Sequence, residues 1–340
     1  MTERKTMADI ARLAGVSSST VSRALKGNPS IPTITRDRIL RVVEENNYII
    51  DERAQNFRLQ RSQTIATLFP YYGNRKRLIS DPFYMEMIGA ITDELSNYDY
   101  DMVIARVPAD DAQWVSRYLM NKRADGYIMI DRALDNPAIQ QFQDSGANLI
   151  VFGPPIAGQS YICVGGQSVL GGTLAVRHLF SVGRRKIGFI GGERDMVETA
   201  LRSQGYVEGL RECGLNVDTN LMVYTDFTPQ AGDDALASLL QIAPDLDAIF
   251  VCSDFMAIAI MQMLRDMGRR VPEDIAIVGY DGIQLSSHSA PALTTVKQQI
   301  YQSGRLLVQK LFNILDGKPE TSLVLPVELI VRESCGANLP

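Results

Sequence analysis

Small hydroxyl side chains and one guanidinium recur at helical spacing in the segment 18–25, near the start of the chain. Ser18, Ser19, Ser22 and Arg23 are the outward positions if this segment is a helix. Small side chains let a helix enter the major groove deeply, and an arginine can pair with a guanine edge through two hydrogen bonds. The pattern therefore predicts direct contacts to the bases of double-stranded DNA.

Two short helices with a tight turn must position these side chains. Thr6 and Ser17 are residue types that cap helix starts, and Gly15 can adopt the left-handed conformation that a sharp turn needs. Together they predict a helix-turn-helix unit, although an ordinary capped helical hairpin would have the same spacing. The apolar residues of the two helices are Ile10, Ala11, Leu13 and Ala14, followed by Val21, Ala24 and Leu25.

A third helix is expected over residues 35–48, which would close a small core with the first two. Its apolar stripe consists of Ile39, Leu40, Val42 and Val43. Residues 50–63 are rich in Arg, Gln and Asn and have no apolar face large enough to fold alone. We interpret them as a linker that becomes helical on contact with a partner.

Charge is distributed unevenly along the 340 residues. Residues 1–63 contain eleven basic and seven acidic residues, which is a net charge of +4. Because the whole chain has a net charge of −5, residues 64–340 have a net charge of −9. A basic start on an acidic body suits a module that binds phosphates, attached to a part that does not touch DNA.

Cysteine and histidine usage argues against metal, cofactor and catalytic chemistry. Cys163 and Cys252 lie in apolar runs typical of a core, and His178 and His288 are far apart with no carboxylate or cysteine cluster nearby. No phosphate-binding loop and no local nucleophile motif occurs, so we expect no enzyme and no cofactor. The chain lacks an N-terminal apolar segment and any run of eighteen apolar residues, which predicts neither export nor membrane insertion.

From Thr64 onward, apolar strand-like runs alternate with amphipathic helical segments. Such alternation predicts parallel sheets covered by helices on both faces. Eight runs exceed one comfortable open sheet, so we expect two similar α/β halves with a ligand cleft at the carboxyl ends of their strands. The runs span residues 64–69, 102–106, 126–130, 148–152, 186–191, 221–224, 248–252 and 275–279.

Ordered landmarks along nearly the whole chain resemble the lactose-repressor and purine-repressor family, the LacI family. The first is DIARLAGVSSSTVSRAL, residues 9–25. Later landmarks are RRKIGFIGG (184–192), RSQGYVEGL (202–210), VPEDIAIVGYDG (271–282) and PALTTVKQ (291–298). The resemblance implies an α/β protein with a helix-turn-helix head, a hinge, and a two-lobed body of two doubly wound parallel sheets like a periplasmic binding protein.

The implied domains are the head at 1–49, the hinge helix at 50–63 and the effector-binding, dimerising body at 64–340. Within the body, the first lobe is expected at about 64–163 and 288–322, and the second at about 164–287 and 323–340. The sequence departs from the family pattern at Ile50 in place of Pro, at Phe57 in place of Leu, and at Lys26 in place of Asn. The expected DNA-binding residues are Thr6, Ser17, Ser18, Ser19, Thr20, Ser22, Arg23, Lys26, Arg53, Ala54, Phe57 and Arg58.

The resemblance also implies an effector site in the body. Arg202 matches the family arginine that contacts ligand, and Asp281 follows a strand whose end faces the cleft, where a carboxylate suits ligand hydroxyls. A solvated helix charge and a turn residue are the alternatives for these two. The other candidates are Phe83, Tyr84, Asp131, Phe227 and Ser253, with core packing as the alternative for the aromatic residues.

Taken together, the sequence predicts a cytoplasmic, homodimeric transcription regulator that represses a carbohydrate-utilisation operon. Its partners would be double-stranded operator DNA and a small sugar or sugar derivative bound between the lobes, with no membrane involved. A purine- or nucleoside-responsive repressor and a sugar-binding protein without a regulatory role are the alternatives. Many Asp, Arg and Ser contacts would favour a sugar, whereas aromatic sandwiching with few polar partners would favour a purine.

Overall fold

The chain forms two compact units, Met1–Ser62 and Gln63–Pro340, each with its own hydrophobic core. The computed structural model describes residues 5–25, 27–46, 48, 62–71, 77–109, 113–121 and 123–337. Within these ranges, every helix is too short or too polar to cross a bilayer.

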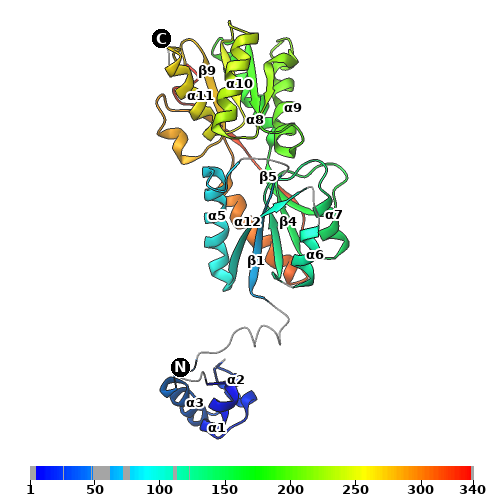
Figure 1. Ribbon diagram of the computed structural model, residues 1–340, viewed down its shortest axis with the longest axis vertical. Coiled ribbons are helices and arrows are strands. Elements are labelled where there is room, and N and C mark those ends of the chain that lie inside the picture. Colours follow the sequence, from blue (N-terminus) through cyan, green and yellow to red (C-terminus); the bar gives the residue numbers. More distant parts are fainter. Residues whose placement is uncertain are drawn as a thin grey trace. The chain divides into compact units, whose positions relative to one another are not determined.

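The first unit consists of three short helices, α1 (Met7–Ala14), α2 (Ser18–Leu25) and α3 (Thr33–Glu45) (Figure 1). The Thr6 hydroxyl accepts a hydrogen bond from the amide of Asp9, whose carboxylate accepts one from the amide of Thr6, which is a capping box. Gly15 ends α1 with φ 61° and ψ 40°, so it makes the left-handed turn. The expected cap and turn are confirmed.

A small apolar core joins the three helices. Ile10, Val21 and Ile39 are fully buried in it. Leu40, which we expected on the apolar stripe of α3, is 44% exposed. Successive helical residues are about 100° apart, so the face that carries Ile39, Val42 and Val43 leaves Leu40 at its edge. The helix also begins at Thr33, two residues before the expected start.

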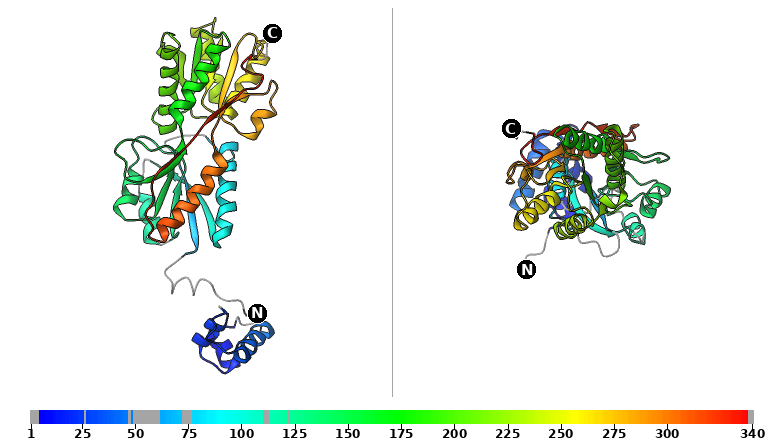
Figure 2. Two further views of the ribbon diagram at one scale, coloured as in Figure 1. Left: turned by 180° about the vertical axis from the view of Figure 1, so that it is seen from behind. Right: turned by 90° about the horizontal axis from the view of Figure 1, so that it is seen from above.

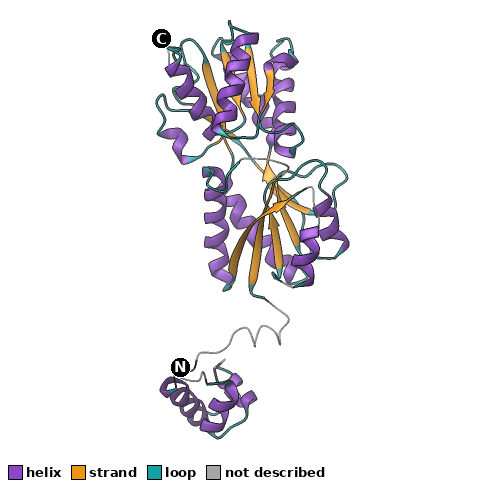
Figure 3. Ribbon diagram, in the orientation of Figure 1, coloured by secondary structure: helices purple, strands orange, loops and turns teal. Residues whose placement is uncertain are grey.

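The second unit contains two six-stranded sheets, and each sheet with its helices forms one lobe (Figure 3). The first-lobe sheet has the strand order β11-β5-β4-β3-β1-β2, and all its paired strands are parallel. Its strands are β1 (Thr64–Tyr71), β2 (Asp101–Pro108), β3 (Gly126–Met129), β4 (Leu149–Phe152), β5 (Ile162–Gly166) and β11 (Leu323–Leu325).

Helices cover both faces of the first-lobe sheet. Two of them, α5 (Pro82–Leu95) and α12 (Ile300–Leu315), pack against each other on one face, and α6 (Gln113–Met120) and α7 (Pro137–Asp144) lie on the other (Figure 1). Separate apolar clusters fill the two interfaces. Buried hydrophobic strands between two helical layers are what the apolar runs predicted.

The second-lobe sheet has the order β12-β10-β9-β8-β6-β7, parallel except for the antiparallel edge pair β10–β12. Helices α8 and α9 pack together, as do α10 and α11. The strands are β6 (Ile187–Gly191), β7 (Met222–Tyr224), β8 (Ala248–Val251), β9 (Ala276–Asp281), β10 (Thr294–Lys297) and β12 (Glu328–Ile330), and the helices are α8 (Ser168–Ser181), α9 (Val197–Glu212), α10 (Pro229–Ile242) and α11 (Asp254–Asp266). Three short 3₁₀ segments accompany them in the described chain, Ser96–Tyr98, Thr219–Leu221 and Gln284–Ser287.

The described chain crosses between the lobes after β5, after β10 and after β11 (Figure 2). These crossings follow Gly166, Lys297 and Leu325, whereas we expected borders near residues 163, 287 and 322. Strands β5 and β10 pair with β4 and β9 and therefore continue each sheet beyond the point where the long apolar runs end. Short strands of this kind have too few residues for a clear periodicity.

Glycines let α8 and α9 pack closely together, and this packing sets the position of α9, the helix that carries Arg202. A Cβ atom on Gly205 would lie 2.0 Å from the carbonyl oxygen of Val169, and one on Gly172 would lie 2.4 Å from the carbonyl oxygen of Arg202. Both neighbours are backbone atoms, so neither can move without shifting a helix.

We expect Gly205→Ala to lower the free energy of unfolding at the upper end of the roughly 1–3 kcal/mol typical of overpacking, because the added methyl meets backbone. Gly188→Ala is the matched control, since its Cβ would meet only leucine side chains, the nearest atom being 3.3 Å away. Urea denaturation of both variants measures the difference. Equal losses would contradict the inference that α8 and α9 are held at minimal separation.

Candidate functional site

The first unit presents its predicted DNA-binding residues along α2 and at the helix starts. Ser19 and Arg23 are exposed, and the Arg23 Nε donates to the Ser19 carbonyl oxygen at 3.3 Å. Ser17 accepts a hydrogen bond from the amide of Thr20 at 3.2 Å, so it caps α2. Ser18, Thr20 and Ser22 are half-buried on the same helix, and Thr6 caps α1.

The remaining predicted DNA contacts are Lys26, Arg53, Ala54, Phe57 and Arg58, which lie outside the described residues. The minor-groove role of Phe57 therefore stays a prediction.

A second candidate site lies between the two lobes, where two small adjoining cavities of about 30 and 20 Å³ are found. Six of the seven predicted effector residues line them: Phe83, Tyr84, Asp131, Arg202, Phe227 and Asp281. The seventh, Ser253, is 1% exposed, precedes the first residue of α11 and does not line either cavity.

Three of these residues have a strained backbone. Asp131, Phe227 and Asp281 have φ angles of 68°, 63° and 119°, and only Gln63 and Asp99 among the other described non-glycine residues have positive φ. Positive φ is unfavourable for residues with a Cβ, and such strain is concentrated where function requires a particular side-chain direction. Here it turns three side chains at strand ends and loops into the same cleft.

Arg202 and Asp281 form the charged centre of the second-lobe wall. Their closest N and O atoms are 3.7 Å apart, and both side chains are about 95% buried, with exposures of 5% and 4%. Arg202 also donates a hydrogen bond to the carbonyl oxygen of Cys252 at 2.7 Å. Its guanidinium carbon lies 3.9 Å from the ring centre of Tyr280. Gln298 donates to Asp281 at 2.7 Å from a crossing between the lobes. Both residues line the cleft, and their contact with an effector stays a prediction.

Asp254, at the start of α11, binds the backbone of the loop that follows β9. Its carboxylate accepts hydrogen bonds from the amides of Gly282 and Ile283 at 2.8 and 3.0 Å, and from the hydroxyl of Thr295 at 2.6 Å. These bonds fix the backbone directly after Asp281, so Asp254 positions the site without lining it.

Glu198 is a site residue that the sequence analysis missed. It lies four residues before Arg202 on α9, is 7% exposed and lines the cleft. A Cβ on Gly153 would lie 2.3 Å from Glu198 Oε1, so the glycine leaves room for the carboxylate. Neither carboxylate oxygen has a hydrogen-bond partner among the described residues. The i,i+4 spacing to Arg202 was the available signal.

Burial raises the pKa of two of the cleft carboxyls, Glu198 and Asp281. The pKa of Glu198 rises to about 7 because burial outweighs the attraction of the Arg132 guanidinium. The pKa of Asp281 also rises to about 7 through burial, although Arg202 and Arg77 oppose the shift. Desolvation is thus the largest influence on these two carboxyls, as expected for charged groups withdrawn from water.

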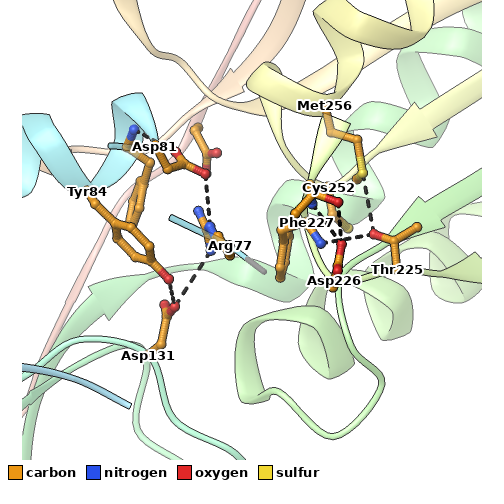
Figure 4. Close-up of polar contacts among 12 residues, drawn as sticks. Arg77, Asp81, Tyr84, Asp131, Thr225, Asp226, Phe227, Cys252 and Met256 are labelled. Atoms are coloured by element: carbon orange, nitrogen blue, oxygen red, sulfur yellow. Dashed lines mark hydrogen bonds and ion pairs between the residues drawn. The ribbon is translucent and has the colours of Figure 1, made fainter. Parts of the chain in front are cut away.

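Arg77 is the second residue that the sequence analysis missed, and it lies at the centre of the cleft (Figure 4). Its guanidinium carbon is 4.2 Å from the ring centre of Tyr84 in the first lobe and 4.6 Å from that of Phe227 in the second. It pairs with Asp81 at 2.9 Å and with Asp131 at 3.6 Å. Asp131 also accepts a hydrogen bond from the Tyr84 hydroxyl.

The buried state of Glu198 predicts a pH-dependent stability difference. An acid whose pKa is raised on folding stabilises the folded state only when protonated, so this contribution is complete below its ordinary pKa of 4.5 and is lost as pH rises through about 7. Glu198→Gln stays neutral at every pH. We expect it to match the parent near pH 4.5 and to exceed it by up to about 3 kcal/mol at pH 8.

Urea denaturation between pH 4.5 and 8 measures this difference. Glu208→Gln, which removes a half-exposed carboxylate from the same helix, controls for the change in net charge. A constant difference between Glu198→Gln and the parent across this range would show that Glu198 is ordinarily solvated.

Comparisons with known proteins match both units. The family model "Bacterial regulatory proteins, lacI family" matches residues 6–51, and the model "Periplasmic binding protein-like domain" matches residues 176–335. The chain is 33% identical to the HTH-type transcriptional regulator CelR of Thermobifida fusca over 338 residues, which cover 97% of this chain and 98% of CelR.

Other similarities extend over the same length. The HTH-type transcriptional repressor CytR of Escherichia coli strain K12 is 31% identical over 339 residues, covering 98% of this chain and 96% of CytR. A solved CelR–cellobiose complex aligns with a TM-score of 0.74, covering 97% of this chain and all of that one. The lac repressor dimer bound to operator aligns with a TM-score of 0.86 at 23% identity, covering 98% and 99%, and supports the fold. The chain therefore belongs to the LacI family and is a DNA-binding transcription regulator, not an enzyme.

Proposed function

We propose that this protein is a cytoplasmic, homodimeric repressor that binds operator DNA through α2 and responds to a sugar held between its lobes. The arrangement of the cleft carries the proposal. Carboxylates of Asp131 and Asp281 and the guanidinium of Arg202 lie around the facing rings of Tyr84 and Phe227. Sugar rings need this combination, because their hydroxyls donate and accept hydrogen bonds while their apolar faces stack on aromatic rings.

The polar content of the cleft favours a sugar over a purine. A purine would be held mainly by stacking, whereas the cavities here are lined by eight charged side chains in addition to six aromatic ones. The solved CelR complex contains cellobiose, and CelR is a relative over nearly the full length of this chain. Both observations support a mono- or disaccharide effector.

Regulation follows from a difference in sugar affinity between two arrangements of the lobes. A ligand that binds one arrangement more tightly shifts the population toward it, and the same coupling energy must appear in the affinity for DNA. In a dimer, two copies of α2 would contact two operator half-sites. A sugar that changes the relation between the lobes thereby changes operator affinity.

We expect Arg23→Ala to weaken specific operator binding by roughly 1–3 kcal/mol per half-site and to relax the preference at one base pair, because it removes a bidentate base contact. Arg41→Ala, on the exposed side of α3, is the control for losing one positive charge. Selection of binding sites from a random DNA pool measures the preference. The same consensus for Arg23→Ala and the parent would exclude Arg23 from base recognition.

We expect Asp281→Asn to weaken sugar binding roughly 10- to 150-fold at pH 8, where the Asp281 carboxyl is ionised, because a neutral amide loses a charge-assisted hydrogen bond worth about 1.5–3 kcal/mol. Fluorescence anisotropy with the operator obtained by that selection measures release by a panel of cellobiose, ribose, glucose, adenosine and cytidine. Arg23→Ala is the reciprocal control, which should lose operator affinity and keep sugar binding by calorimetry. Release by a nucleoside alone would replace the sugar with the purine or nucleoside alternative.

A further inference from the structure

The centre of the cleft between the lobes is occupied by a side chain of the protein itself. Arg77 lines both cavities, and its side chain is only 14% exposed. The larger cavity beside it, about 30 Å³, has room for about two water molecules. Binding pockets for small molecules usually measure roughly 300–1,000 Å³. In this arrangement of the lobes, a sugar ring therefore cannot enter while the guanidinium remains in place.

The surroundings of Arg77 have the form of a binding slot. Tyr84 and Phe227 face the guanidinium at 4.2 and 4.6 Å and belong to different lobes. Asp81 accepts a hydrogen bond from Arg77 Nε at 2.9 Å, and Asp131 lies 3.6 Å from its Nη1. Figure 4 shows the carboxylates on one side of Arg77 and Phe227 on the other. Two rings and two carboxylates thus surround one flat, hydrogen-donating group.

We propose that Arg77 is a built-in ligand of this slot and competes directly with the effector. The inference rests on the proposed function in assigning the slot to a sugar. A guanidinium and a sugar ring use the same features, since both stack between aromatic faces and both donate hydrogen bonds to carboxylates. The effector must displace Arg77 before its ring can lie between Tyr84 and Phe227.

Two consequences follow from this competition. The apparent affinity for the effector is lowered by the fraction of molecules in which Arg77 has left the slot. The stack of Tyr84, Arg77 and Phe227 also spans the two lobes, so it holds them together when no effector is bound. As a competing internal ligand, Arg77 therefore sets the effector concentration at which the regulator responds.

Removal of the side chain should leave a slot that accepts a free guanidinium. We expect full-length Arg77→Ala to bind methylguanidinium chloride saturably in calorimetry, and the parent to bind it at least roughly tenfold more weakly. The double variant Arg77→Ala with Phe227→Ala should also bind roughly tenfold more weakly, because one stacking face is gone. Methylammonium chloride at equal concentration controls for ionic strength and for charge without a planar group.

Equal binding of methylguanidinium by Arg77→Ala and the parent would refute the proposal that Arg77 occupies a binding slot. The absence of binding by a folded Arg77→Ala would refute it as well. Circular dichroism establishes that the variant is folded. If Arg77→Ala does not fold, Arg77→Gly is the second variant for the same titration, since it also vacates the slot.

The competition itself is tested with whichever sugar of the panel releases the operator from the parent. We expect Arg77→Ala to bind that sugar roughly tenfold more tightly than the parent, because no internal group has to leave. Weaker or equal binding by the variant would show that Arg77 contacts the bound sugar or is irrelevant to it, and would refute the competition. If no sugar releases the operator, the proposed function fails, while the methylguanidinium titration still decides whether Arg77 occupies a binding slot.

Discussion

The burial of Arg202 beside Asp281 is the constraint on which the rest of the effector-binding body depends. Charged groups withdrawn from water destabilise a fold unless they are paired and hydrogen-bonded. Here the pairing draws together the end of β8 through the Cys252 carbonyl, the end of β9 through Asp281, and a lobe crossing through Gln298. Helix α9 must hold Arg202 at that point, and the glycines between α8 and α9 allow it to do so.

Several buried polar atoms around the cleft lack hydrogen-bond partners. Within the described part of the chain, the Nε atoms of Arg132 and Arg202 and both oxygens of Glu198 have no hydrogen-bond partner. Buried polar groups rarely lack partners, and each unmet one favours a ligand or a water that supplies the missing bond. The backbone of Arg132 meanwhile accepts a hydrogen bond from the amide of Val197, which links the two lobes directly.

Local signals made the head and much of the cleft predictable from the sequence. Thr6, Gly15 and Ser17 act through neighbours within a few residues, and Asp281 ends an apolar strand whose carboxyl end faces the cleft. The sequence did not identify Arg77 and Glu198, because their positions in the cleft depend on contacts with Phe227 and Gly153, which are distant in sequence. Ser253 lies outside both cavities for a related reason, since a residue at a strand end can point into the cleft or under the following helix.

Gly153 of the first lobe and Glu198 of the second lobe lie in close contact, and the carboxylate fills the space that a side chain at residue 153 would need. Because a Cβ on Gly153 would lie 2.3 Å from the carboxylate oxygen, the Glu198 side chain must move away or be shortened before residue 153 can be enlarged. The left-handed φ of 128° at Gly153 adds a second restriction on that position. The ligand preference of this corner is therefore more easily changed at residue 198 than at residue 153. An effort to redesign the regulator as a biosensor for a bulkier or less polar molecule would begin with residue 198.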